Sequence, residues 1–228
     1  MPARRHSRLP ILLGAALVAC GTCVNADQPI SVAESRLFLS NHLDNLPDTA
    51  ALQYAYTRAG SLEAPSEDRV RVTISPAANG SGRQVQVDYL TGAQHFELPA
   101  IGAAHGNPVI LFFLERDVRE MQRLTGGQAS YFRRRVRTAL ADAAEVRPVT
   151  LQFAGRSVAG EQITVQPYRD DPLRERFERL ADKVYTFTLS DQIPGAVYRV
   201  QTLVSAPGAG VDTPPLIAET LTLVGAEP

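Results

Sequence analysis

The densest group of side chains able to bind a ligand is a run of arginines near the middle of the chain. Arg133, Arg134 and Arg137 share one face of a predicted helix. The helix before it carries three more, which are Arg116, Arg119 and Arg123. A guanidinium presents paired N–H donors to phosphate and carboxylate groups. We therefore take Arg134 and Arg137 as candidates for binding the anionic headgroup of a lipid, a lipopolysaccharide phosphate or a carboxylate-rich partner.

Acidic residues are interleaved with Arg116, Arg119 and Arg123 on the earlier of the two helices. This spacing leaves a second interpretation of the arginine cluster open. Glu115 and Glu120 stand three or four positions from an arginine, and Asp117 lies between them. Ion pairs form on a helix at this spacing. The arginine face would then be solvated and paired with its own acids. Arg135 lies off this face and is expected nearer the sheet.

Two adjacent phenylalanines make the first turns of the same helix apolar nearly all round. Phe112 and Phe113 stand between Leu111 and Leu114. A helical segment that is apolar on every side is either buried on every side or lines an apolar cavity. Both arrangements fit the pattern, and we take the cavity as the hypothesis. Its candidate wall residues are Tyr54, Phe112, Phe113, Leu114, Phe132 and Tyr185.

The histidines do not form a recognisable site. His42, His95 and His105 include no i, i+4 pair of the kind that binds zinc on a helix, so we interpret them as surface or loop histidines. An enzyme would need His95 or His105 to meet an acid in a cleft, and a hydrolase with such scattered residues is the least favoured alternative. The sequence has no nucleophile elbow, phosphate loop or dinucleotide fingerprint. We expect no catalytic residue, no cofactor and no metal.

The first 26 residues have the pattern of an export signal. Three arginines precede an apolar stretch at 9–19, which is shorter than the roughly 20 residues of a membrane-spanning helix. Small side chains end the segment at Ala26, where a signal peptidase would cut. The lipobox-like sequence Leu-Val-Ala-Cys offers another end, with Cys20 lipidated as the first mature residue. We expect an exported protein, located in the periplasm, or at the outer membrane if Cys20 carries lipid.

Charge and composition narrow the class of protein. The chain has 228 residues, 44% of them hydrophobic and 21% charged, which is typical of a globular domain. Removal of the signal takes three of the 23 basic residues and none of the 24 acidic ones, so the mature protein is mildly acidic. A mildly acidic protein binds the phosphate backbone of a nucleic acid poorly, and we expect no nucleic acid partner.

Alternating strands and two amphipathic helices predict the architecture. Apolar and polar residues alternate at five places, around Tyr54, Val70, Val85, Tyr185 and Tyr198. Alternation is typical of strands with one buried face. Asn107 predicts the start of a helix over 108–124, a second helix follows, and Asp171 predicts the cap of a short helix over 172–181. We predict a single α+β domain over 27–228, with a curved antiparallel sheet of about eight strands and helices covering one face, as in a half-barrel.

This architecture resembles the periplasmic lipoprotein carriers of the Lol type, which are half-barrels. The likeness rests on the export signal and helix 108–124, and on the strands at Tyr54, Val70, Val85, Tyr185 and Tyr198. No diagnostic motif accompanies it. The resemblance implies an acyl chain held in an apolar cavity between sheet and helices.

We predict a non-enzymatic bacterial cell-envelope protein that binds a lipid or another apolar ligand between the sheet and the helices. The alternative is an envelope interaction or scaffold subunit that uses the arginine-rich helical face. The expected partners are a lipid, a lipoprotein or another envelope protein. Contact with a membrane is expected only through a lipid on Cys20.

Overall fold

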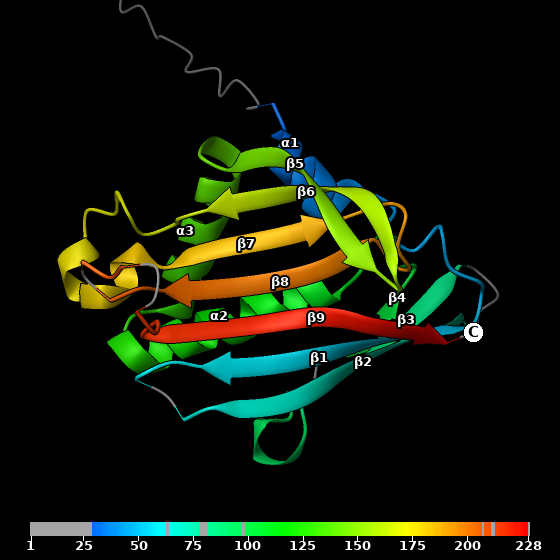
Figure 1. The fold of residues 1–228 in the computed structure, drawn as a ribbon, viewed down its shortest axis with the longest axis horizontal. Helices are drawn as coiled ribbons and strands as arrows, with labels where there is room; N and C mark the ends of the chain where they lie inside the picture. Colours follow the sequence, from blue (N-terminus) through cyan, green and yellow to red (C-terminus); the bar gives the residue numbers. More distant parts are fainter. Residues whose placement is uncertain are drawn as a thin grey trace, which may run out of the picture.

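Nine antiparallel strands form one sheet in the computed structural model, in the order β4-β3-β2-β1-β9-β8-β7-β6-β5 (Figure 1). They are β1 Ala50–Ala59, β2 Ser66–Pro76, β3 Arg83–Tyr89, β4 Ile101–Gly102, β5 Glu145–Phe153, β6 Arg156–Val165, β7 Val184–Leu189, β8 Val197–Val204 and β9 Ile217–Glu227. The structure describes residues 29–62, 64–77, 82–96, 99–206, 208–210 and 213–227. The predicted signal over 1–26, with Cys20, lies outside the described residues.

The strands form where the sequence alternates. Leu52, Tyr54 and Tyr56 of β1 all point to the same buried face of the sheet, since side chains two positions apart share a face. Tyr54 stands opposite Val70 of β2 on one side and Leu223 of β9 on the other. Because β9 pairs with both β1 and β8, the last strand joins the two halves of the sheet.

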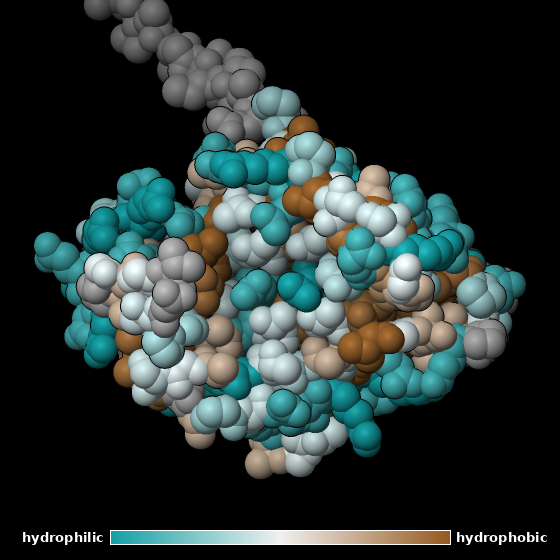
Figure 2. Space-filling model, in the orientation of Figure 1, coloured by the Kyte–Doolittle hydropathy of each residue, from teal (hydrophilic) through white to brown (hydrophobic). Residues whose placement is uncertain are grey.

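Two long helices cover one face of the sheet, as Figure 1 shows. They are α2 (Val109–Thr125) and α3 (Ala129–Asp142). A short helix, α1 (Val32–Glu34), continues into the π-helical turn η1 (Ser35–Leu39) and lies against α3. The other face of the sheet is open, and Figure 2 shows mostly hydrophilic and intermediate residues across it.

The predicted fold class is confirmed, with an open antiparallel sheet and helices on one of its faces. The described residues give nine strands rather than about eight, the shortest being the two-residue edge strand β4. The helix predicted over 172–181 is wrong. Two short 3₁₀ segments, η3 (Arg174–Arg176) and η4 (Glu178–Asp182), replace it, because Glu178 takes a positive φ of 48° that an α-helix does not allow.

A buried ion pair holds the middle of α2 against the sheet. The carboxylate of Asp117 accepts hydrogen bonds from the ammonium of Lys183 and from the hydroxyl of Tyr185. Asp117 and Lys183 are only 1% and 2% exposed. Lys183 is the only lysine of the chain. Two charges removed from water are stable only as a pair, so this contact fixes the position of α2 over the start of β7.

A second ionic network ties the same helix to the centre of the sheet. Glu219 of β9 is 2% exposed and pairs with Arg116 of α2 at 2.9 Å and with Arg58 of β1 at 3.1 Å. Arg58 also contacts Glu120 at 2.7 Å, and Glu120 pairs with Arg123 at 2.6 Å. The interface between helix and sheet is therefore both ionic and apolar.

Lys183→Met is expected to destabilise the fold by about 3–5 kcal/mol, because it leaves the Asp117 carboxylate buried without a counter-charge. Urea denaturation followed by circular dichroism measures this loss. In the matched double variant Asp117→Leu/Lys183→Met both charges are gone, so most of the stability should return. A loss below about 1 kcal/mol in the single variant would contradict the role given to this pair.

Glu120 is expected to make the stability of the fold depend on pH in the acid range. Hydrogen bonds from Arg123 and Arg58, with their charges, lower the pKa of Glu120 to about 2. A carboxyl group whose folded pKa is depressed stabilises the fold above its unfolded pKa of about 4.3, and that contribution is lost as pH falls toward the folded value. At pH 6 the free energy of unfolding of the wild-type protein should be about 2 kcal/mol larger than that of Glu120→Gln. This difference between the two proteins should decrease steadily as the pH is lowered to about 2.5. Urea titrations at several pH values test this, and a constant gap would refute it.

Candidate ligand-binding groove

Asn107 fixes the start of α2 on the sheet. Its amide nitrogen donates to the Tyr54 hydroxyl at 2.8 Å and to the Gly195 carbonyl at 3.0 Å. Its amide oxygen accepts from the N–H of Val109, the first residue of α2, at 3.2 Å. Tyr54 in turn donates to the Val197 carbonyl at 3.1 Å. The helix begins at Val109, one residue later than predicted, with Pro108 rather than Asn107 at the N-cap position. Tyr54 is held by hydrogen bonds within the core.

His42 belongs to the same junction and is not a surface histidine, contrary to the sequence interpretation. It is 2% exposed, its Nδ1 accepts from the Asn107 N–H at 3.1 Å, and its Nε2 lies 2.7 Å from the Arg36 carbonyl. Because Nδ1 accepts a hydrogen bond and Nε2 faces a carbonyl oxygen, the ring must be the neutral tautomer with its proton on Nε2. Burial lowers the pKa of His42, in agreement with that assignment. The ring therefore links η1 to α2 and has a structural role.

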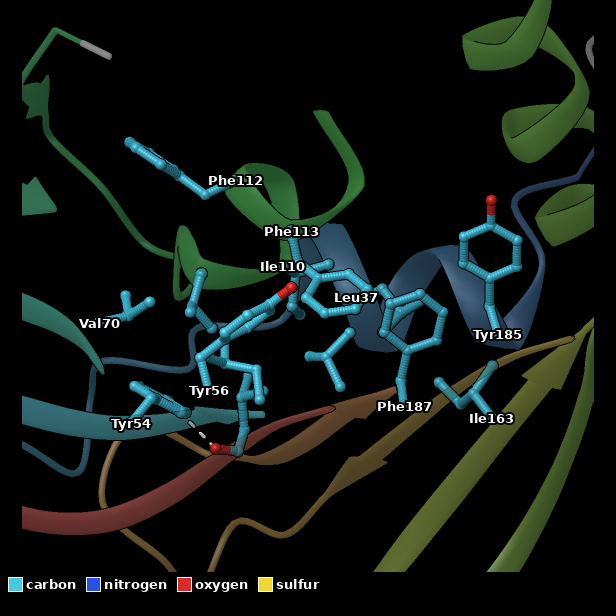
Figure 3. Packing of buried hydrophobic residues seen from close by; sticks show 14 of the residues in the cluster. Leu37, Tyr54, Tyr56, Val70, Ile110, Phe112, Phe113, Ile163, Tyr185 and Phe187 are labelled. Carbon is cyan, nitrogen blue, oxygen red and sulfur yellow. Dashed lines mark hydrogen bonds between the residues drawn. The ribbon is translucent and has the colours of Figure 1, made fainter. Parts of the chain in front are cut away.

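The five candidate wall residues of the interior belong to one buried core, part of which Figure 3 shows. Phe112 stacks on Tyr89, with ring centroids 5.8 Å apart, and meets Phe96 edge-on at 6.0 Å. Phe113 points from α2 into the core that Figure 3 shows between helix and sheet. Both phenylalanines are at most 2% exposed. The first turns of α2 are therefore buried, apart from Leu111 and Leu114.

Phe132 and Tyr185 belong to another aromatic group, at the β7 side of the core. Phe132 contacts Tyr168 and Phe177 at centroid distances of 5.8 and 5.6 Å. Tyr185 reaches Tyr168 through their hydroxyl groups at 3.2 Å. Side chains of the core thus enclose five of the six candidate wall residues in this structure, and a ligand site among them stays a prediction.

An apolar groove lies on the outer side of the helices, where α2, α3 and η1 meet. Its volume is about 340 Å³. The residues that line it are Glu34, Phe38, Leu111, Leu114, Glu115, Val118, Arg133, Val136, Arg137 and Leu140. The sixth candidate wall residue, Leu114, is therefore part of this groove, as is the candidate headgroup residue Arg137. Leu111 is 52% exposed and Phe38 is 36% exposed.

The wall formed by η1 is fixed by contacts just before it and in its first turn. The Ser31 hydroxyl accepts from the Glu34 N–H and the Glu34 carboxylate accepts from the Ser31 N–H, both at 3.1 Å, which is a capping box. Arg36 pairs with Glu161 of β6 at 2.7 Å. This turn positions Phe38 beside the two long helices, where it completes the groove.

Charged residues surround the apolar walls. Arg133 binds the Glu115 carboxylate with two hydrogen bonds, of 2.5 and 2.8 Å, across the α2–α3 junction. These bonds lower the pKa of Glu115. Arg137 is exposed, and no ion pair engages it within the described part of the chain. The rim therefore offers one guanidinium that is available to an anion.

Two other arginines of the cluster differ in their contacts. Arg134, the second candidate headgroup residue, is exposed and lies over the Tyr131 ring at 5.4 Å. Arg135 pairs with the buried Asp171 at 2.7 Å and donates to the Pro167 carbonyl at 3.1 Å. The expectation that Arg135 lies inward is correct. Asp171 also accepts from Tyr131, so it joins α3 to the loop after β6.

The remaining histidines stand apart from the groove. His95 lines a polar hollow of about 720 Å³ on the open face, with Asp68 and Asp88. The Asp68 carboxylate is engaged by the N–H and hydroxyl of Thr91, and His95 faces the Leu90 carbonyl at 3.2 Å. His105 is exposed in the loop before α2. The residues that the structure describes include no group of three His, Cys, Asp or Glu placed to hold a metal.

This groove was not predicted from the sequence, although the sequence contains the apolar pattern that forms two of its walls. Leu111, Leu114 and Val118 of α2 repeat at helical spacing, and so do Val136 and Leu140 of α3. Two such stripes on consecutive helices face each other when the helices fold back. What the sequence could not show is that η1, more than 70 residues earlier, supplies the third wall.

Comparisons with known proteins give likeness of architecture only. No protein-family model matches the sequence, and no curated protein matches it. The chain is similar in structure to the lipoprotein LppX of Mycobacterium tuberculosis, with 11% identity, 84% of this chain and 92% of LppX covered, and a TM-score of 0.34. It is similar to the MucA/MucB complex of Pseudomonas aeruginosa, with 14% identity, 86% of this chain and 54% of that chain covered, and a TM-score of 0.33.

A third match is the LolA superfamily protein NE2245 of Nitrosomonas europaea, with 10% identity, 86% of this chain and 92% of that chain covered, and a TM-score of 0.24. A protein of the LolA superfamily is therefore among the structures matched, at this low TM-score. Helices able to cross a bilayer are not found among the described residues.

Proposed function

We propose that this protein is a non-enzymatic protein of the bacterial cell envelope that binds a lipid or another apolar ligand in the groove between η1, α2 and α3. The observation that carries the proposal is the aliphatic floor and walls of this groove, left open beside Leu111 and Phe38. Ligand pockets range from about 300 to 1,000 Å³, and the groove lies at the lower end of that range. Covering its apolar surface with a hydrocarbon chain removes that surface from water, which is favourable.

The charges at the rim favour an amphiphile with one anionic group. Arg137 stands one residue after Val136 and three before Leu140, both of which form the floor of the groove. A tail lying along these residues would place its headgroup at the Arg137 guanidinium. Arg133 is less available, because its guanidinium is already bound to Glu115. A fatty acid or a lipid phosphate has the chemistry that this arrangement fits.

The groove is favoured over the interior as the resting site of the ligand. A chain between sheet and helices would have to displace α2 and break two buried ion pairs, Asp117 with Lys183 and Glu219 with Arg116. Loss of one partner from a buried pair is strongly destabilising. Tyr54, Phe112, Phe113, Phe132 and Tyr185 would contact a ligand only after such a movement.

The alternative occupant is an amphipathic helix of another envelope protein. The groove runs between two helices and has charges at its rim, which is the form that helix-in-groove recognition takes. An envelope interaction subunit would use the same Leu111, Leu114 and Arg137. A soluble fatty-acid probe with one hydrocarbon chain distinguishes the two hypotheses, since only the lipid hypothesis requires the groove to bind this probe.

Leu114→Trp should weaken binding of a dansyl-labelled undecanoic acid about tenfold, because the larger ring occupies the groove without opening the core. Val224→Trp on the open face is the matched control and should bind as wild type does. Arg137→Gln should weaken binding of the acid by about three- to tenfold while leaving the corresponding alcohol unchanged, because only the acid forms a charge-assisted bond. Fluorescence titration measures each affinity.

Two results would refute the proposed site. Equal binding by Leu114→Trp and Val224→Trp would remove the groove from consideration. Absence of any binding of the acid or the alcohol by the wild-type protein would reject lipid binding and leave the helix-docking alternative.

A further inference from the structure

Exposed apolar residues line the groove at Phe38 and Leu111 and continue at Leu39, the neighbour of Phe38 in the chain. Leu39 ends η1 directly after Phe38 and is 60% exposed, and Leu111 is 52% exposed. We call Phe38, Leu39 and Leu111, with Arg134 and Arg137, the docking face. Single exposed apolar residues are normal on a protein, whereas a group beside an apolar groove marks an interaction surface.

The docking face is locally basic on a protein that is acidic as a whole. Arg134 and Arg137 lie one turn apart on α3, both exposed. The nearby Glu115 is neutralised by Arg133, and the Glu34 carboxylate is used in the capping box of α1. An anionic surface would therefore attract Arg134 and Arg137 on this side of the molecule.

The first described residues of the chain lie at the same place. The Ser31 hydroxyl donates to the Leu140 carbonyl at 3.0 Å, so the chain enters the fold beside the end of α3 and the floor of the groove. Eight residues, 21–28, separate Cys20 from Pro29. Fully extended they span at most about 30 Å. A lipid on Cys20 would hold the docking face within that distance of a bilayer.

We propose that the docking face binds an anionic lipid bilayer directly, in addition to any tether on Cys20. Phe38, Leu39 and Leu111 enter the interfacial region, and Arg134 and Arg137 contact lipid phosphates, as on amphipathic interfacial helices. The groove then opens toward the membrane, so the amphiphile it takes up comes from the bilayer. This last step rests on the proposed function, whereas docking itself does not.

The test uses the chain from Asp27 onward, which retains every described helix and strand and lacks Cys20. Its binding to vesicles of phosphatidylglycerol and phosphatidylethanolamine is compared by co-sedimentation with binding to phosphatidylcholine vesicles. We expect at least tenfold stronger partition to the anionic vesicles, falling as salt is raised. Leu39→Asp/Leu111→Asp should reduce it at least tenfold. The matched control, Val224→Asp, replaces an equally exposed residue of the open face and should reduce it little.

A second variant separates the charge contribution. Arg134→Gln/Arg137→Gln should lose most of the preference for anionic over neutral vesicles. The natural chain has no tryptophan, so Leu111→Trp reports its own environment, and its emission should shift to shorter wavelength only with the anionic vesicles.

The outcomes are distinguishable from those of the groove experiment. Equal partition to both kinds of vesicle, or equal losses in Leu39→Asp/Leu111→Asp and Val224→Asp, would overturn docking. If the dansyl acid binds but vesicles do not, docking is wrong and the proposed function stands. If vesicles bind but the acid does not, docking stands and the groove is not a lipid site. Capture of an envelope protein by the docking face without vesicle binding would also overturn the proposal.

Discussion

Buried polar contacts fix helix α2 to the sheet at its start and along its length, and the other features of the molecule follow from this attachment. Asn107 holds the first turn, Asp117 binds Lys183, and Arg116 binds Glu219. Each contact has donors and acceptors in defined directions, so α2 has one position over the sheet rather than several equivalent ones. Core side chains pack between this helix and the sheet, and we propose the outer side of the same helix as the ligand site.

The groove exists because α2 has more apolar surface than the sheet can cover. Phe112 and Phe113 pack inward, whereas Leu111 and Leu114 remain on the outer side. The second helix and η1 shield part of this stripe but do not close over it. A packed core and an open apolar groove are thus two consequences of one helix, and together they favour a ligand held at the surface of the fold.

The architecture could be predicted from the sequence, and the location of the groove could not. Alternation around Tyr54, Val70 and Tyr185 is a local pattern that depends only on neighbours in the chain, so the strands and the fold class were predictable. The polar partners of α2 come from residues distant in sequence, such as Lys183 and Glu219, and no local pattern shows which acid meets which base. The same limit applies to Phe38, whose place beside Leu114 depends on the hydrogen bonds of Ser31 and the ion pair of Arg36.

The central claim is that an apolar ligand occupies the outer groove while α2 remains bound to the sheet. Methyl NMR with a saturated fatty acid tests it most directly, because Leu114, Val118 and Leu140 report the groove, and Val200 and Leu221 report the interior. The account predicts nuclear Overhauser contacts from the ligand chain to the groove methyls only, with the interior methyls unmoved. Contacts from the ligand to Val200 or Leu221 would contradict it, since they require α2 to leave the sheet.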